Sequence, residues 1–177
     1  MDPESKWIKE IQRRGSRTAA DCLISAHYDE IYVFCYRQMG RKEDAMDLTQ
    51  EIFLAVLRAI PRYDARKASF RTWLYRIASN KVIDFRRRIH PALISLDEAD
   101  ETPVDDFALT IHDSLLLEQI EEYVSGCDPG VQAVFRLHLY GDKPFPDIAQ
   151  ILGEQESTVK ARYYRLLNRL RKEFANV

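Results

Sequence analysis

Apolar residues recur at intervals of three and four along most of the chain, which is the spacing that places them on one face of an α-helix. Residues 5–40 show this spacing in two stretches, separated at Gly15. A third stretch covers residues 41–60 and stops before a proline. A fourth runs from residue 70 to about residue 88, and Ser69 precedes it as a suitable N-cap. The pattern predicts a bundle of helices in the first half of the chain.

The helix expected over residues 41–60 carries two kinds of surface. Its main apolar set follows helical spacing and consists of Ala45, Leu48, Ile52, Ala55, Val56 and Ala59. Beside it lies a mostly acidic stripe made of Asp44, Asp47, Gln50, Glu51 and Leu54. A helix with this pattern either lies deep in a bundle or docks on a partner, and both interpretations stay open.

The sharpest local pattern lies near the C-terminus. Helices are expected over residues 114–124 and 130–140, then over 145–152 and from 157 to about 174. Ala149, Gly153 and Val159 have the spacing of a helix-turn-helix, in which a small residue permits close approach and the glycine accepts the turn. The second helix of such a motif enters the major groove with its first residues. An ordinary helical hairpin is the alternative.

The overall charge of the 177 residues argues at first against a nucleic-acid partner. The chain has 26 Lys and Arg against 28 Asp and Glu, a net charge of −2. The distribution changes this picture, because residues 1–90 carry a balance of +6, residues 91–135 a balance of −11, and residues 136–177 a balance of +3. Residues 62–90 hold nine basic side chains and two acidic ones, interleaved with aromatic residues, which favours nucleic acid over a merely solvated surface.

The helical spacing and these charge blocks together predict an all-α protein of two small helical domains joined by an acidic flexible linker. The domains are expected over residues 1–90 and 113–177, with the linker over residues 91–112. The three cysteines form no metal-ligand spacing, the four histidines receive no role, and no catalytic motif is found. We therefore expect no enzyme activity, no metal, no cofactor and no small-molecule substrate. The acidic, polar N-terminus and the lack of a long apolar run predict a cytoplasmic protein.

Three segments in this order resemble bacterial RNA polymerase sigma factors of the extracytoplasmic-function (ECF) group, in the sigma-70 family. Residues 44–53 (DAMDLTQEIF) are similar to the polymerase-binding helix of region two. Residues 70–80 (FRTWLYRIASN), followed by Asp84 and three arginines, resemble the segment that reads the −10 promoter element. The motifs at 147–149, 152–153 and 158–162 resemble the region-four helix-turn-helix, which reads the −35 element. The resemblance covers nearly the whole chain.

The resemblance implies roles for particular residues. Contacts to the β and β′ subunits of core polymerase fall on Asp44, Asp47, Gln50, Glu51 and Phe53. Contacts to −10 DNA fall on Tyr63, Arg66, Lys67, Arg71, Trp73, Arg76, Asn80, Lys81, Arg86 and Arg87, and the loop from Tyr63 to Ser69 would line a pocket for an extruded base. Core packing is an equal alternative for Trp73. Contacts to −35 DNA fall on Ser157, Thr158, Lys160, Ala161, Arg162, Tyr164 and Arg165.

The expected function is that of an initiation factor that directs core RNA polymerase to promoters. The resemblance also implies an anti-sigma protein as a partner, which in this group is often bound to the membrane. Asp147 stands where the family usually has Glu, and Ala161 lacks the hydroxyl often found there, which affects the expected −35 sequence preference. Two other functions stay open, a stand-alone helix-turn-helix regulator of duplex DNA and a protein-interaction adaptor.

Overall fold

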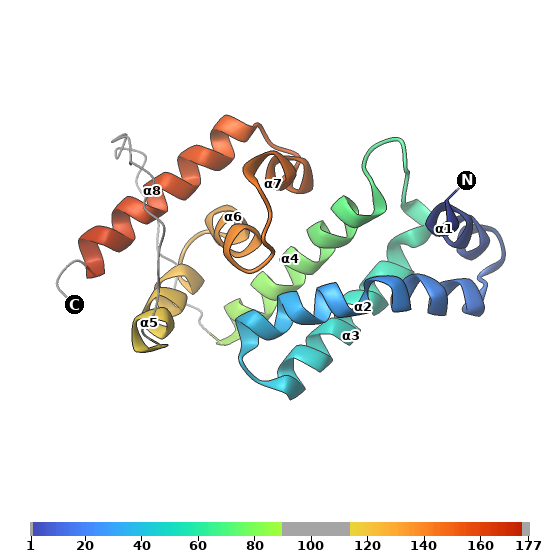
Figure 1. The fold of residues 1–177 in the computed structure, drawn as a ribbon, viewed down its shortest axis with the longest axis horizontal. Helices are drawn as coiled ribbons and strands as arrows, with labels where there is room; N and C mark the ends of the chain where they lie inside the picture. The colour runs from blue at the N-terminus through green and yellow to red at the C-terminus, as the bar shows by residue number, and fades with distance from the viewer. Residues whose placement is uncertain (1, 90–113, 175–177) are drawn as a thin grey trace. The chain divides into compact units, whose positions relative to one another are not determined.

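A computed structural model describes residues 2–89 and 114–174. Within these ranges the chain forms eight α-helices, one short 3-10 helix and no strand (Figure 1). Contacts between residues divide the chain into two compact units, residues 1–82 and 83–177. The expected all-α fold is therefore confirmed for the described residues. The linker predicted over residues 91–112 lies outside them.

The first unit contains α1 (Pro3–Arg14), α2 (Arg17–Met39), α3 (Lys42–Ala59), the 3-10 helix η1 (Ile60–Arg62) and most of α4 (Phe70–Ile89). Local sequence sets the helix ends. The Asp2 carboxylate accepts a 2.7 Å hydrogen bond from the Ser5 amide at the start of α1, and Gly15 ends that helix with a φ of 61°. Gly40 ends α2 with a φ of 69°. Both positions are left-handed, where glycine has no steric cost.

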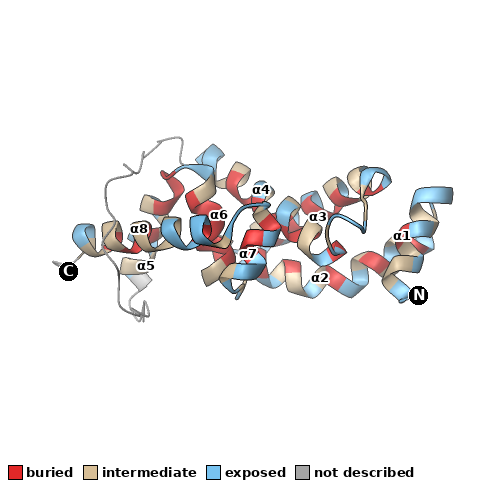
Figure 2. Ribbon diagram, turned by 90° about the horizontal axis from the view of Figure 1, so that it is seen from above, coloured by how far each residue is buried: buried red, intermediate tan, exposed pale blue. Residues whose placement is uncertain are grey.

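The core of the first unit lies where α2, α3 and α4 face one another. Figure 2 shows buried residues recurring along each of these helices between exposed ones. Ile31 and Ile52 are fully buried, and Phe34 stacks its edge against Tyr75 with ring centroids 5.5 Å apart. On α3 the predicted apolar positions Ala45, Leu48, Ile52 and Val56 are buried, so the periodic pattern identified the correct face.

The second unit contains α5 (Ser114–Ser125), α6 (Pro129–Leu139), α7 (Phe145–Leu152) and α8 (Glu156–Phe174). The Asp128 carboxylate caps α6 by accepting from the amides of Gly130 and Val131. The side chain of Arg136 carries a fully buried charge in this unit. The fully buried guanidinium of Arg136 donates to Glu121 at 2.9 Å and to the Ser125 hydroxyl at 3.1 Å. Pairing of this kind is what makes a buried charge tolerable.

The observed helices match the predicted ones within one or two residues at most ends. The Ser69 hydroxyl accepts a 3.1 Å hydrogen bond from the Thr72 amide, which confirms the predicted N-cap of α4. The one new element is η1, where the chain tightens around Pro61 after α3. Among the described residues, no helix is long and apolar enough to cross a membrane.

Candidate promoter and polymerase interfaces

The acidic stripe of α3, here Asp44, Asp47, Gln50 and Glu51, faces solvent. Asp47, Gln50 and Glu51 are exposed, while Asp44 is half-buried and lies 3.7 Å from the Nε of Arg41. Leu54, one turn further on, is an exposed apolar side chain at 53%. The stripe therefore offers carboxylates beside an apolar contact, on a helix whose other side is fixed in the core.

Phe53 does not belong to this exposed surface. Its side chain is only 4% exposed, and its ring stacks on Tyr28 with centroids 6.2 Å apart. In the free protein it contributes to the packing of α3 against α2. The resemblance grouped Phe53 with the stripe as a polymerase contact, but its burial separates it from the exposed residues of the stripe.

Four of the residues predicted to contact −10 DNA share one face of α4. Trp73, Arg76, Asn80 and Arg87 are spaced at three, four and seven residues, which aligns them on a helix. Arg76, Asn80 and Arg87 are exposed and Trp73 is half-buried. Arg87 pairs with Asp84 at 2.7 Å. This face combines cations, an amide and an aromatic ring, the groups that bind phosphates and bases.

The other predicted residues of α4 have partners on the protein. Lys81 lies 3.9 Å from Glu51 of the acidic stripe. Arg71, on the far side of the helix, is paired with Glu30 at 2.7 Å but keeps a 60% exposed side chain. Arg86 is mostly buried and lies 3.2 Å from Glu121 inside the second unit. Burial lowers the pKa of Arg86.

The loop between η1 and α4, residues 63–69, is held by its own hydrogen bonds. The Tyr63 hydroxyl donates to the Ala68 carbonyl at 2.9 Å, which closes the loop across its base. At its tip the Asp64 carboxylate accepts from the Arg66 amide at 3.0 Å and from its guanidinium at 2.8 Å. The hydrogen bonds from Arg66 lower the pKa of Asp64 to about 2. The loop is thus a defined turn, with Arg66 and Lys67 exposed at its tip.

An aromatic cluster lies at the base of the same loop. The Tyr63 ring contacts Trp73 and Phe70 with centroids 5.0 and 5.8 Å away, and Phe70 is fully buried. The two interpretations of Trp73 therefore both have support in its surroundings. One side of the ring packs on Tyr63 and Phe70, while the residue as a whole stays half-exposed.

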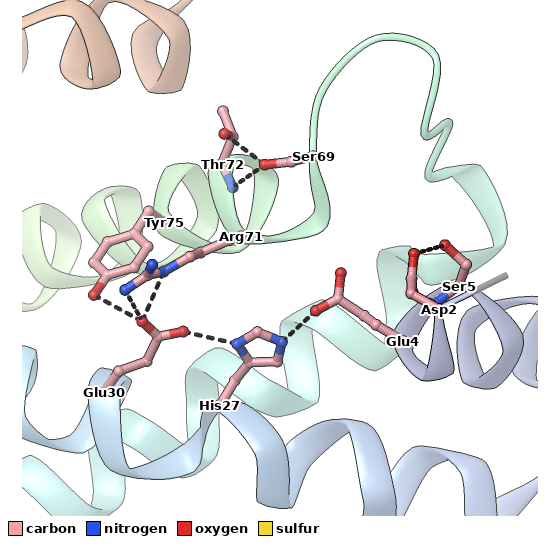
Figure 3. A network of polar contacts seen from close by, with 9 residues as sticks. All are labelled: Asp2, Glu4, Ser5, His27, Glu30, Ser69, Arg71, Thr72 and Tyr75. Carbon is pink, nitrogen blue, oxygen red and sulfur yellow. Dashed lines mark hydrogen bonds and ion pairs between the residues drawn. The ribbon is translucent and has the colours of Figure 1, made fainter.

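A polar network behind α4 was not expected from the sequence (Figure 3). The two ring nitrogens of His27 each lie 2.7 Å from a carboxylate, Nε2 from Glu4 of α1 and Nδ1 from Glu30 of α2. Glu30 also accepts from Arg71 at 2.9 Å and from the Tyr75 hydroxyl at 3.5 Å. The network links the consecutive helices α1 and α2 to α4 and ends on Arg71, a residue predicted to contact DNA.

The network has a defined protonation state. The hydrogen bond to Glu30 raises the pKa of His27 against the effect of burial, and Glu4 adds to the rise. Burial alone would raise the pKa of Glu30, but His27 and Arg71 together lower it. A neutral imidazole has one N–H, whereas both carboxylates here need a donor. The two 2.7 Å contacts therefore favour the imidazolium form of His27, which can donate to both carboxylates.

In the second unit, α7 and α8 form the predicted helix-turn-helix. Gly153 ends α7 with a φ of 70°, and its amide donates to the Ala149 carbonyl. Ala149 is 7% exposed and Val159 is fully buried, as the motif requires. Leu166, Leu167 and Leu170 continue the buried stripe of α8. The N-terminal turns of α8 are thereby held at an exposed position.

The residues predicted to contact −35 DNA fall into two groups on α8. Ser157, Thr158, Lys160 and Ala161 are exposed in the first turns, where Lys160 pairs with Glu156 at 2.6 Å. Arg162, Tyr164 and Arg165 are half-buried. The Nε of Arg165 donates to the Ala161 carbonyl at 3.3 Å.

Arg162 has structural partners that the sequence did not suggest. Its guanidinium lies 2.5 Å from the Glu154 carboxylate in the turn after α7. It also lies against the start of α6, since a Cβ added to Gly130 would come within 3.1 Å of the Arg162 guanidinium carbon. Arg162 thus links α8 to the turn after α7 and to the start of α6.

Comparisons with known proteins identify both units. Residues 23–90 match the family model of sigma-70 region 2, and residues 117–170 match that of sigma-70 region 4. The chain is 32% identical over 155 residues to the ECF RNA polymerase sigma factor SigE of Mycolicibacterium smegmatis, spanning 60% of that protein's length. It is 27% identical to SigW of Bacillus subtilis, with 97% of each chain covered.

A third relative and a solved structure are also similar to this chain. The chain is 31% identical over 163 residues to the ECF sigma factor SigM of Mycobacterium tuberculosis, covering 77% of that protein. The solved structure of CnrH in complex with the cytosolic domain of CnrY has a similar fold, with a TM-score of 0.62 at 23% identity over 99% of this chain. Two region models in the family's order, together with relatives of this similarity, show that the chain belongs to the ECF sigma factors of the sigma-70 family.

Proposed function

We propose that this ECF sigma factor directs core RNA polymerase to promoters through two separate DNA-binding faces, one in each unit. The observation that carries the proposal is the coexistence of three surfaces: the acidic stripe of α3, the aromatic and basic face of α4, and the exposed start of α8. A stand-alone helix-turn-helix regulator needs only the third. Sigma factors are initiation factors without a reaction of their own, so the family confirms that the chain is not an enzyme.

For the −35 element, the first turns of α8 enter the major groove. The groups for base edges and phosphates there are Ser157, Thr158, Lys160, Ala161, Tyr164 and Arg165. Arg165 is the best candidate for a guanine contact, because its guanidinium carries several donors in a fixed fork. Arg162 acts through its contacts to Glu154 and α6 and supports the geometry of the motif.

For the −10 element, α4 and the loop over residues 63–69 receive unpaired bases. Trp73 and Tyr63 supply aromatic rings for stacking, and Asn80 supplies an amide for a base edge. Phosphate contacts fall on the cations around them: Arg66, Lys67, Arg71, Arg76, Lys81 and Arg87. Arg86 is not included, because it is mostly buried in its ion pair with Glu121.

For the polymerase, the acidic stripe of α3 docks on basic surfaces of the β and β′ subunits. Asp44, Asp47, Gln50 and Glu51 provide the polar contacts and Leu54 an apolar one. A dedicated anti-sigma protein is the proposed regulator, and it places the factor in the cytoplasm or at the inner face of the membrane. The similar structure of CnrH bound to a cytosolic domain supports such a partner.

Run-off transcription with core polymerase on a library of randomised promoters tests the proposal. We expect transcripts only when the factor and core polymerase are both present, and selected promoters with two conserved elements at fixed spacing. Selection of a single duplex element by the factor alone would instead favour the stand-alone regulator.

A further inference from the structure

Among the described helices of the first unit, α1 is the one that lies wholly outside the family-model match, which begins at residue 23. Its apolar side, which includes the buried Ile8, packs on the rest of the unit. One of its polar side chains, Gln12, contacts the start of the loop over residues 63–69. Another, Glu4, begins a series of contacts that reaches Arg71, just after the end of the loop. These contacts give α1 a part in the geometry of the −10 pocket.

At the entry to the loop, α1 contributes Gln12. The amide nitrogen of Gln12 donates to the Ile60 carbonyl at 2.9 Å and to the Tyr63 carbonyl at 3.0 Å. One side-chain amide thus binds the carbonyl of the first residue of η1 and the carbonyl of the residue that follows η1, where the loop begins. Tyr63 is also the residue whose ring contacts Trp73 and whose hydroxyl closes the loop on Ala68.

At the exit from the loop, α1 contributes Glu4. Its carboxylate accepts from His27, which binds Glu30, and Glu30 holds the guanidinium of Arg71 (Figure 3). Arg71 is the second residue of α4, two positions after the N-cap Ser69. The relay therefore fixes the side chain that stands at the end of the loop.

We propose that α1 is a positioning element of the −10 site, in which Gln12 and Glu4 hold the two ends of the loop in the geometry that accepts an extruded base. This inference rests on the proposed function, because it assumes that the loop binds −10 DNA. Gln12 and Glu4 do not touch the base themselves. They act through Tyr63 and Arg71.

The Gln12→Ala variant of the holoenzyme tests this role. Alanine is a better helix former than glutamine, so α1 keeps its helix and its apolar packing. We expect about fivefold weaker binding to a promoter selected as above, the effect of losing about 1 kcal/mol of hydrogen bonding at the pocket. Gln12→Glu, which sets a carboxylate against two carbonyl oxygens, lowers binding further.

A promoter with an abasic site separates positioning from general stability. Abasic sites are scanned through the −10 non-template strand, and the position with the largest loss for the wild-type holoenzyme marks the extruded base. On that abasic promoter Gln12→Ala and wild type should bind equally, because the pocket is empty in both. Glu4→Gln should behave like Gln12→Ala. The matched control is Glu10→Gln, which removes the same charge from the same helix.

The outcomes distinguish the two proposals. Equal losses on the intact and the abasic promoter, or no loss on either, overturn the positioning role of α1. If the wild-type holoenzyme shows no promoter-specific binding at all, the proposed function itself fails. Binding of each variant to core polymerase is measured in parallel and should equal that of the wild type.

Discussion

The imidazolium of His27 makes the first unit sensitive to pH in a defined direction. Because the folded state raises the pKa of His27 above 6.5, the ion pairs with Glu4 and Glu30 stabilise the unit fully below pH 6.5. This stability is lost as the pH rises through the raised pKa. In denaturant unfolding we expect His27→Gln to cost about 2 kcal/mol at pH 6. The difference from wild type should shrink on going to alkaline pH, and a constant difference would contradict the assignment.

Arg162 and Arg165 are neighbours on α8 with different expected roles. Arg165→Ala should weaken binding of the holoenzyme to the −35 duplex, and should lower the salt slope by about 0.9 if its contact is to a phosphate. Arg162→Ala should leave the slope unchanged and lower the melting temperature, since it removes the link to Glu154. Glu154→Gln provides the check. It should weaken DNA binding if Arg162 supports the motif, and strengthen it if Glu154 merely competes with DNA for a contact residue.

At the residue scale the sequence was informative where spacing alone decides a position. Periodicity identified the exposed Asp47 and Asn80 and the buried Val159. It could not assign His27, because Glu4, one of the two carboxylates at its ring, comes from another helix 23 residues upstream. The i, i+3 spacing of His27 and Glu30 was the one local sign of this network.

At the scale of elements, the turn of the helix-turn-helix depends on Gly153. Its φ of 70° lies in the left-handed region, where a Cβ costs about 1–2 kcal/mol. Gly153→Ala should therefore lower the free energy of unfolding of the second unit by about 1 kcal/mol, measured by denaturant titration. The comparison variant is Ser157→Ala on the exposed start of α8, which should leave stability nearly unchanged. An unchanged free energy of unfolding for Gly153→Ala would mean that the turn relaxes to another conformation.

The acidic stripe of α3 yields a second prediction at this scale. Asp47→Ala should weaken binding to core polymerase severalfold without a change in melting temperature, because the side chain is exposed and the core positions of α3 are untouched. Glu43→Ala, on the same helix but outside the stripe, should bind as wild type does. Binding to core is measured by competition for labelled holoenzyme, and equal losses for both variants would indicate a general charge effect.

The helices themselves could be predicted almost fully, since each is marked by apolar periodicity and by a cap or a glycine. The 3-10 turn η1 could not, because a proline after a helix is equally compatible with an open loop. Nor could the partners of Arg86 and Arg162, for which the family resemblance implied contacts to DNA. The sequence does not distinguish an arginine that binds a DNA phosphate from one that pairs with a carboxylate of its own protein.

At the scale of the whole molecule, the distribution of charge along the chain says more about DNA binding than the net charge does. The net charge of −2 combines a basic N-terminal block, an acidic middle block and a weakly basic C-terminal block. We expect the isolated chain to bind its selected promoter duplex weakly, with a Kd of about 10 µM or above at physiological salt. The holoenzyme should bind far more tightly. Fluorescence anisotropy checks both, and nanomolar binding by the chain alone would favour a stand-alone regulator.

The position of His27 gives the protein a built-in reporter of DNA engagement. Both ring nitrogens lie 2.7 Å from a carboxylate, so the two N–H signals of the protonated ring should lie downfield of the amide region in NMR spectra. If Arg71 turns toward a phosphate, Glu30 loses a cation and attracts the proton of His27 more strongly, which raises the pKa of the ring further. If promoter binding raises the pKa of His27, thermodynamic linkage requires that protonation of His27 in turn strengthens promoter binding. Acidification of the cell would thus strengthen −10 engagement without any added ligand.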